Sequence, residues 1–196
     1  ATDIFKPVMN VLPKSPQDKF FGPHLERSKR IVADHLRTAI FLIGDGVLPS
    51  NTDQGYVLRK IIRRAVRHSS SLGLALLPVV EIVEAYASVY GNVNEHKELF
   101  SDKEKHRIEN VVHEEELKFR ETLARGLKKF ENTLNISVNS IVKVNGGVNA
   151  EISGKDVFDL YQTDGFPIEL IKEIAEERGL TVDEKGFSEE MKKHQA

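Results

Sequence analysis

The stretch PSNTDQGYVLRKIIRRAVRH, residues 49–68, decides how the fold is interpreted, because it separates into two faces only as a helix. At about 100° per residue, one arc is apolar, and it holds Leu58, Ile61, Ile62, Ala65 and Val66. The opposite arc is basic with one tyrosine, and it holds Tyr56, Arg59, Lys60, Arg63, Arg64 and Arg67. The stretch therefore predicts an amphipathic helix over 53–69. We expect it to be capped by Ser50, Asn51, Thr52 or Asp53.

The segments on either side of this helix also have helical periodicity. We expect a short helix near 3–11 and a longer one over 24–44, which Gly44 and Gly46 end. Residues 78–90 predict another helix that starts with a proline. The longest periodic segment is 101–134, with 8 acidic and 8 basic side chains, which is typical of a long solvated helix with one packed face. The chain is therefore expected to be mainly α.

The character of the sequence changes after residue 134. β-Branched residues flank NGG, which predicts a small β-hairpin near 138–152. Ser153 is expected to cap a short helix to about Tyr161, and a further helix runs from Pro167 to Gly179. One more helix ends the chain. We predict a helical domain over 1–134 and a hairpin with a helical subdomain over 135–196, packed as one unit.

Several kinds of site are excluded or disfavoured by the sequence. There is no cysteine, so disulfides and thiolate ligands are absent. Neither phosphate-binding glycine motif occurs. Glu109 and His113 lie one helical turn apart, and His106 lies one heptad before His113, but no further ligand follows in a fixed pattern, so we predict no metal site. His35 lies on the apolar stripe of its helix, which indicates a partly buried histidine rather than a catalytic one. We predict no catalytic residue in this chain.

The termini and hydropathy give further expectations. No apolar run approaches the roughly 20 residues that span a bilayer. Residues 1–10 show no basic region followed by an apolar core, so we expect no signal peptide there. We expect no membrane partner and a cytoplasmic location. Because the chain lacks an initiator methionine and starts in mid-pattern, we expect it to be a piece of a larger protein.

The charge of the chain is unevenly distributed. The formal net charge is −2, yet five of the basic side chains fall within 59–67, while residues 151–196 carry 12 acidic and 6 basic side chains. A local basic face on a near-neutral protein favours a polyanionic partner, and arginine binds phosphates or base edges in two-point fashion. A nucleic acid is one such partner. An acidic protein surface, or a plain solvated helix face, also fits the pattern.

Several long segments of the sequence resemble one protein family. RIVADHLRTAIFLIGDGVLPSNTDQGYVLRKIIRRAVRHSSSLG (30–73) resembles a segment of alanyl-tRNA synthetases that runs Ala-Asp-His-(Ile/Leu)-Arg, Asp-Gly-Val-(Leu/Met)-Pro-Ser-Asn and Arg-Gly-Tyr-Val-Leu-Arg-Arg-Ile-Ile-Arg-Arg-Ala. EEELKFRETLARGLKKFE and ISGKDVFDLYQTDGFPIELIKEIAEERGLTVDEKGF are similar to later segments of that family, in the same order. TDIFKPVM resembles the stretch after its third class II signature. The resemblance covers nearly the whole chain.

The resemblance implies a mainly helical tRNA-recognition region that reads a G·U wobble pair in the acceptor stem of alanine tRNA. It implicates Asn51, the asparagine of Pro-Ser-Asn, and the aspartate of the family word Leu-Tyr-Asp-Thr-Tyr-Gly-Phe-Pro. This chain reads LYQTDGFP, so either Gln162 or Asp164 would replace that aspartate. The remaining residues would contact the tRNA backbone, namely Tyr56, Arg59, Lys60, Arg63, Arg64 and Arg67.

The resemblance also implies a parent enzyme, alanine–tRNA ligase, which attaches alanine to tRNA with ATP and Mg²⁺. Its catalytic domain would lie upstream and its editing domain downstream. The segment itself would bind no cofactor and would be inactive in aminoacylation. The alternative is a stand-alone helical module that binds RNA or protein without ligase activity.

Overall fold

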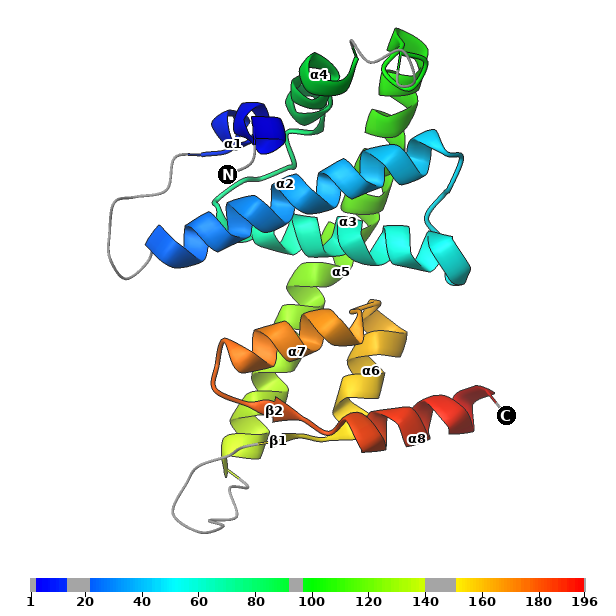
Figure 1. Cartoon of the computed structure of the whole chain (residues 1–196). Coiled ribbons are helices and arrows are strands. Elements are labelled where there is room, and N and C mark those ends of the chain that lie inside the picture. The colour runs from blue at the N-terminus through cyan, green and yellow to red at the C-terminus, as the bar shows by residue number, and fades with distance from the viewer. Residues whose placement is uncertain (1–2, 14–21, 92–96, 140–150, 196) are drawn as a thin grey trace. The chain divides into compact units, whose positions relative to one another are not determined.

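In a computed structural model, residues 3–13, 22–91, 97–139 and 151–195 are described (Figure 1). These residues form helices, one 3₁₀ turn and one two-stranded sheet, so the expected mainly α fold is confirmed. They divide into two compact units, Ala1–Phe119 and Arg120–Ala196, each of which is described by itself below. The sequence predicts a domain boundary at residue 134, the expected end of the long helix, and this boundary stays a prediction.

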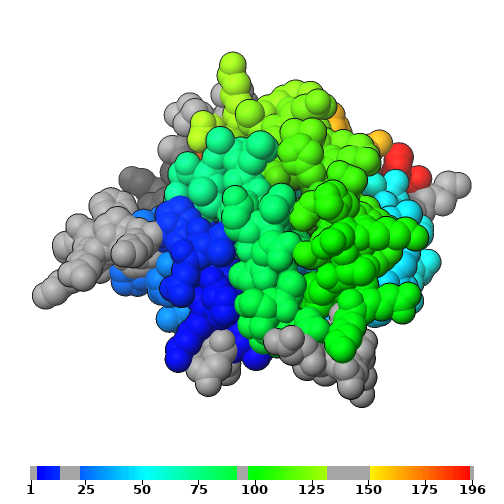
Figure 2. Space-filling view, turned by 90° about the horizontal axis from the view of Figure 1, so that it is seen from above, coloured from blue at the N-terminus to red at the C-terminus, as the bar shows by residue number. Residues whose placement is uncertain are grey.

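The first unit consists of helices and short turns. Its elements are η1 (Asp3–Phe5), α1 (Lys6–Val11), α2 (Gly22–Gly44), α3 (Asp53–Ser71), α4 (Val79–Tyr90) and the first part of α5 (Asp102–Asn139). The long segment predicted over 101–134 is thus one helix, and it continues five residues further. Figure 2 shows α1 in blue beside α4 in green on one face of this unit.

The core of the first unit is built on the α2–α3 pair, and the other helices add to it. Its fully buried apolar side chains include Val32, Leu36, Ile40, Leu58, Ile62, Ala65, Ile82, Tyr86, Ile108, Val112 and Phe119. In α3, Leu58, Ile62, Ala65 and Val66 are buried as the apolar arc predicts, whereas Ile61 is partly exposed. His68 is also buried, and its Nδ1 lies 3.0 Å from Ser28 Oγ.

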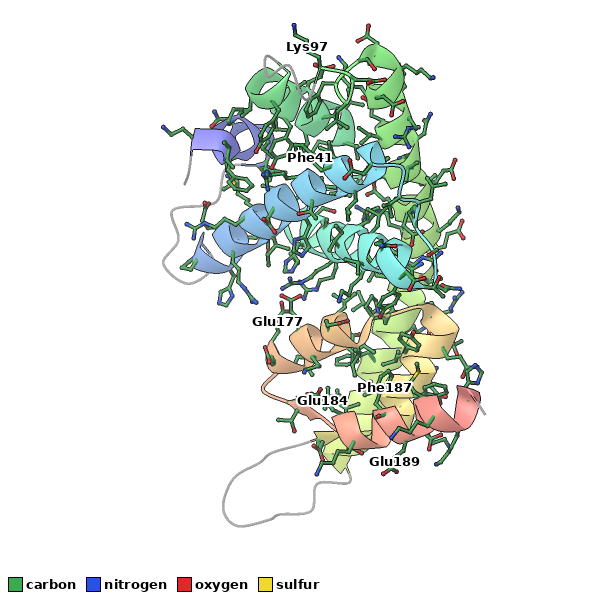
Figure 3. All side chains as sticks on the ribbon, turned by 45° about the vertical axis from the view of Figure 1, so that its right-hand side comes forward. Phe41, Lys97, Glu177, Glu184, Phe187 and Glu189 are labelled. Carbon is green, nitrogen blue, oxygen red and sulfur yellow. The ribbon has the colours of Figure 1, made fainter. Side chains whose placement is uncertain are left out.

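Aromatic rings join α2 to α4 in the same unit. Phe41, labelled on α2 in Figure 3, meets Tyr90 edge to face with 5.2 Å between ring centroids. Tyr90 in turn stacks on Phe100 at 6.4 Å. Arg37 Nε donates to the Tyr90 hydroxyl over 2.9 Å. Such edge-to-face and stacked pairs add to the energy of burying the rings.

The second unit contains the rest of α5, then β1 (Glu151–Ile152), α6 (Gly154–Asp164), α7 (Ile168–Glu176), β2 (Thr181–Val182) and α8 (Glu184–Gln195). The two strands are parallel, with Glu151 opposite Thr181 and Ile152 opposite Val182. A parallel pair needs a crossover connection, and α6 with α7 provides it. In Figure 3 the ring of Phe187 projects from α8, and it meets Tyr161 of α6 at 5.6 Å.

The hairpin expected near 138–152 falls mostly outside the described residues. Residues 140–150 are not among them. Residues 138–139 end α5, and residues 151–152 form β1. The β-branched signal of this segment is thus met in part by a strand, which pairs in parallel with β2.

The expected start of α6 is confirmed, but the helix ends at Asp164, three residues beyond the end expected near Tyr161, and α7 lies within the predicted span from Pro167 to Gly179. Ser153 Oγ accepts from the Asp156 amide over 3.2 Å and caps α6. Gly165 takes the left-handed conformation, with φ 64°, and ends that helix at Asp164. Pro167 precedes α7, and Gly179 follows it with φ 71°. Positive φ angles of this kind are strained for residues with a Cβ, so both stop positions favour glycine.

Candidate nucleic-acid interface

Asn51 is exposed in a tightly bonded turn that leads into α3. The Ser50 amide donates to the Gly55 carbonyl over 3.1 Å, and Ser50 Oγ donates to the Thr52 carbonyl over 2.9 Å. A Cβ on Gly55 would collide with Ser50 Oγ, so only glycine fits there. Of the four expected capping residues, Thr52 takes the N-cap position, although no side chain bonds to the helix amides from it. The turn holds the backbone of Asn51 in one place at the start of the basic helix.

The carboxamide of Asn51 is bonded to the basic face of α3. Arg59 Nη1 donates to Asn51 Oδ1. Arginine carries only donors, so it must meet the oxygen of the amide and not the nitrogen. The need of Arg59 for an acceptor therefore fixes the orientation of the carboxamide. The NH₂ group of Asn51 points away from Arg59.

A buried carboxylate of α5 lies behind the same face. Only 4% of the Glu115 side chain is exposed. Its Oε1 accepts from Arg63 Nε over 2.7 Å and lies 3.5 Å from Arg59 Nε. The Arg63 guanidinium also lies 5.1 Å from the centroid of the Phe119 ring, and its side chain is 13% exposed. Two of the arginines are thus held inside the first unit rather than projecting fully into solvent.

The other members of the predicted basic face are partly exposed and also have partners within the unit. Lys60 Nζ lies 5.9 Å from the centroid of the Tyr56 ring. Arg67 Nη1 donates to Ser71 Oγ over 3.0 Å. All six residues predicted for the tRNA backbone lie on α3, together with Asn51 at its N-terminal end. Each of the six side chains is partly exposed.

His35 lies between α2 and α3 and is largely buried, as its place on the apolar stripe predicts. Its side chain is 14% exposed. Burial is the main cause that lowers the pKa of His35, and Arg64 adds to this effect, while the hydrogen bond to Asp34 opposes it. Arg64 Nη1 lies 3.1 Å from Nε2, which must accept because arginine only donates. Nδ1 therefore carries the proton and donates to Asp34 Oδ2 over 3.2 Å.

The second unit contains Gln162 and Asp164, which have opposite environments. Gln162 is exposed on α6. The Asp164 side chain is 1% exposed, and its Oδ1 accepts from Arg125 Nε over 2.9 Å. Lys129 Nζ lies 3.8 Å from Oδ2. Asn51 belongs to the first unit, whereas Gln162 and Asp164 belong to the second.

The site residues predicted from the sequence do not include Glu115 and Arg125, which contact them. Glu115 lies between Val112 and Phe119 on the packed face of α5, and a carboxylate on an apolar stripe is a signal that a cation must face it. Arg125 gave no such signal, because its partner Asp164 is distant in sequence.

The described residues contain neither a group of metal-binding side chains nor a helix that could cross a membrane. No cluster of three His, Asp or Glu side chains that would hold a metal occurs in residues 3–13, 22–91, 97–139 and 151–195. His106 Nδ1 donates to the Asp102 carbonyl over 2.7 Å. Within the same residues, no helix has the length and apolar character needed to cross a bilayer.

Comparison with known proteins gives matches along the whole chain. The family model described as tRNA synthetases class II (A) matches residues 1–196. Alanine–tRNA ligase of Ligilactobacillus salivarius is 41% identical over 204 aligned residues, which cover 100% of this chain and 21% of the relative. The ligase of Microcystis aeruginosa is 43% identical over 172 residues, covering 86% and 18%, and that of Bacillus mycoides is 40% identical over 200 residues, covering 98% and 21%.

The chain belongs to the family of class II (A) tRNA synthetases. The resemblance to alanyl-tRNA synthetases, which rested on Pro-Ser-Asn and the basic words that follow it, is confirmed by these relatives. The chain spans about a fifth of the length of the curated relatives it matches.

Proposed function

We propose that this chain is the acceptor-stem-reading segment of an alanine–tRNA ligase. The observation that carries the proposal is the exposed Asn51, whose carboxamide is held in one orientation at the tip of a basic helix. Base-edge contacts specify sequence while phosphate contacts position the protein, and α3 offers residues for both. The relatives named alanine–tRNA ligase support the enzyme class.

The opposite side of the G·U pair would be read by Gln162. A wobble pair leaves the guanine 2-amino group as a donor in the minor groove, which is wide and accessible in A-form RNA. An acceptor is needed there. Of the two alternatives left by the sequence, Gln162 is exposed and its Oε1 can accept, whereas Asp164 is buried against Arg125. Burial therefore favours Gln162, and we assign Asp164 a structural role.

The phosphate contacts would come from the partly exposed members of the basic face. Lys60, Arg64 and Arg67 lie along one side of α3, and Tyr56 adds an aromatic ring that can stack on a ribose or a base. Arg63 is less suited, because its side chain is only 13% exposed and its guanidinium is already bonded to Glu115. Backbone contacts of this kind set affinity and salt dependence rather than the choice of base pair.

The proposal extends to the whole ligase. It would attach alanine to its tRNA with ATP and Mg²⁺ in the cytoplasm, using a catalytic domain before this segment and an editing domain after it. The segment itself would contribute no catalytic residue and would not aminoacylate tRNA alone.

The test is aminoacylation by the full-length ligase carrying Asn51→Ala. We expect kcat/KM for a G·U acceptor minihelix to fall toward the value for its G·C counterpart, since a base contact is worth about 1–3 kcal/mol. Asn110→Ala, which removes an exposed asparagine of α5, is the matched control and should leave the ratio unchanged. If the Asn51 variant keeps the full preference for G·U, the proposed function of this surface is wrong.

A further inference from the structure

We propose that Arg59 is a positioning residue that makes Asn51 a hydrogen-bond donor toward the base pair, and thereby sets the preference for uracil over cytosine. This inference rests on the proposed function, in which Asn51 faces the acceptor stem. It assigns Arg59 a part in specificity, which differs from the phosphate contact that the sequence predicts for it.

The argument begins with the symmetry of an asparagine side chain. A carboxamide that rotates by 180° exchanges its oxygen acceptor for its NH₂ donor, at nearly the same shape. An exposed asparagine without a partner samples both orientations and reads neither base edge strictly. In this chain Arg59 Nη1 donates a hydrogen bond to Asn51 Oδ1. The rotated amide would instead point its N–H groups at a guanidinium, so that orientation is disfavoured and the NH₂ group is the one offered outward.

Arg59 is itself held in place by a buried carboxylate, Glu115 of α5. Its Nε lies 3.5 Å from Oε1 of Glu115, a side chain that is only 4% exposed. Glu115 is fixed in turn by Arg63, whose Nε donates to the same oxygen over 2.7 Å. The guanidinium therefore bridges a buried carboxylate and an exposed carboxamide. A side chain that is 26% exposed, ion-paired with Glu115 and hydrogen-bonded to Asn51, is suited to hold a neighbour rather than to move onto a phosphate.

The orientation of Asn51 has a direct consequence for base recognition. In a G·U pair the pyrimidine presents the O4 carbonyl, an acceptor, at its major-groove edge. In a G·C pair it presents the N4 amino group, a donor, at the same place. An NH₂ group on Asn51 bonds to the first and opposes the second. Specific recognition of base edges in RNA is concentrated at ends and irregular sites of helices, where this edge is accessible.

The positioning role and a phosphate contact predict different kinetic results. If Arg59 only contacted phosphate, its loss would weaken G·U and G·C stems alike. If it orients Asn51, its loss frees the amide to rotate, and cytosine is then accepted through Oδ1. The ratio of the two kcat/KM values therefore separates the two roles.

The experiment compares Arg59→Met and Arg67→Met in the full-length ligase, with G·U and G·C acceptor minihelices as substrates. Both variants lose one positive charge from α3, and Arg67 bonds to Ser71 rather than to Asn51. For Arg59→Met we expect the G·U to G·C ratio of kcat/KM to fall about tenfold, as expected for one lost discriminating hydrogen bond. For Arg67→Met both values fall together and the ratio stays at the wild-type value. An equal fall of both values in Arg59→Met overturns the inference.

A second variant guards against a folding defect. Arg59→Lys keeps a positive charge beside Glu115 but lacks the fork that reaches both partners, so we expect a folded enzyme with a reduced ratio. An unchanged ratio in this variant also overturns the inference. Side-chain ¹⁵N relaxation of Asn51 in the 196-residue chain gives a readout without RNA: the NH₂ group should become more mobile in Arg59→Lys. If the wild-type ligase itself shows no preference for G·U, the proposed function fails, and the inference fails with it.

Discussion

Gln162 and Asp164, the two candidate residues of the segment LYQTDGFP, differ in solvent exposure because of helix geometry. Residues 162 and 164 both belong to α6, and positions two apart in a helix point about 200° apart. One side chain is therefore exposed when the other is buried. Asp164 is the buried one, with its carboxylate against Arg125 and near Lys129. An acidic residue at this place thus supports the fold of the second unit, while Gln162 remains available to a ligand.

A stability measurement tests this role of Asp164. Arg125→Met removes the nearest cation and leaves a buried carboxylate with only a more distant partner, Lys129. We expect the free energy of unfolding of the second unit to fall by about 1–2 kcal/mol, less than for a fully buried pair because Arg125 is 61% exposed. Urea denaturation followed by circular dichroism measures it. Lys128→Met, an exposed position on the same helix, is the control, and an equal effect in both variants would contradict the role.

At the scale of elements, the helix boundaries could be predicted because they depend on local chemistry. Ser153, Gly165 and Pro167 act within one turn of their own positions, so their residue types suffice. The environment of the basic face could not be predicted in the same way. Arg63 meets Glu115 across 52 residues of sequence, and a helical projection shows which face is basic but not what packs against it.

The contact between α2 and α3 gives a pH-dependent prediction. The pKa of His35 is lowered below its ordinary value of 6.5 by burial, with the cation of Arg64 adding to the shift. The unfolded chain therefore binds a proton more readily than the folded one. Stability from this group is fully present above pH 6.5 and is lost as the pH falls toward the pKa of the folded state.

We expect urea midpoints of the chain to fall between pH 7.5 and pH 5.5, and His35→Gln to reduce this fall. Glutamine keeps a donor and an acceptor but does not titrate. His113→Gln, at an exposed position on α5, should keep the wild-type pH dependence. An equally steep fall in the His35 variant would show that other groups cause it.

At the scale of the whole molecule, the fold class could be predicted from the sequence, but the pairing of distant segments could not. The mainly α class follows from periodicity that runs through most of the chain, and it is confirmed. The parallel pairing of β1 with β2 joins residues 151–152 to 181–182, and no local signal specifies such a partner. The net charge of −2 conceals a basic helix and an acidic C-terminal region. Any binding to RNA must therefore depend on a local surface and not on overall attraction.

This locality predicts how RNA binding responds to salt. Each phosphate neutralised by α3 releases condensed counterions, so the logarithm of the association constant should fall linearly with the logarithm of salt concentration. Lys60→Ala should lower affinity for G·U and G·C minihelices alike and reduce the slope by about 1. Asn51→Ala should leave the slope unchanged, because its carboxamide carries no charge. Filter binding over a series of salt concentrations measures both quantities. A slope near zero for the wild-type chain, or a slope lowered equally by the two variants, would mean that the basic face of α3 does not contact the RNA backbone.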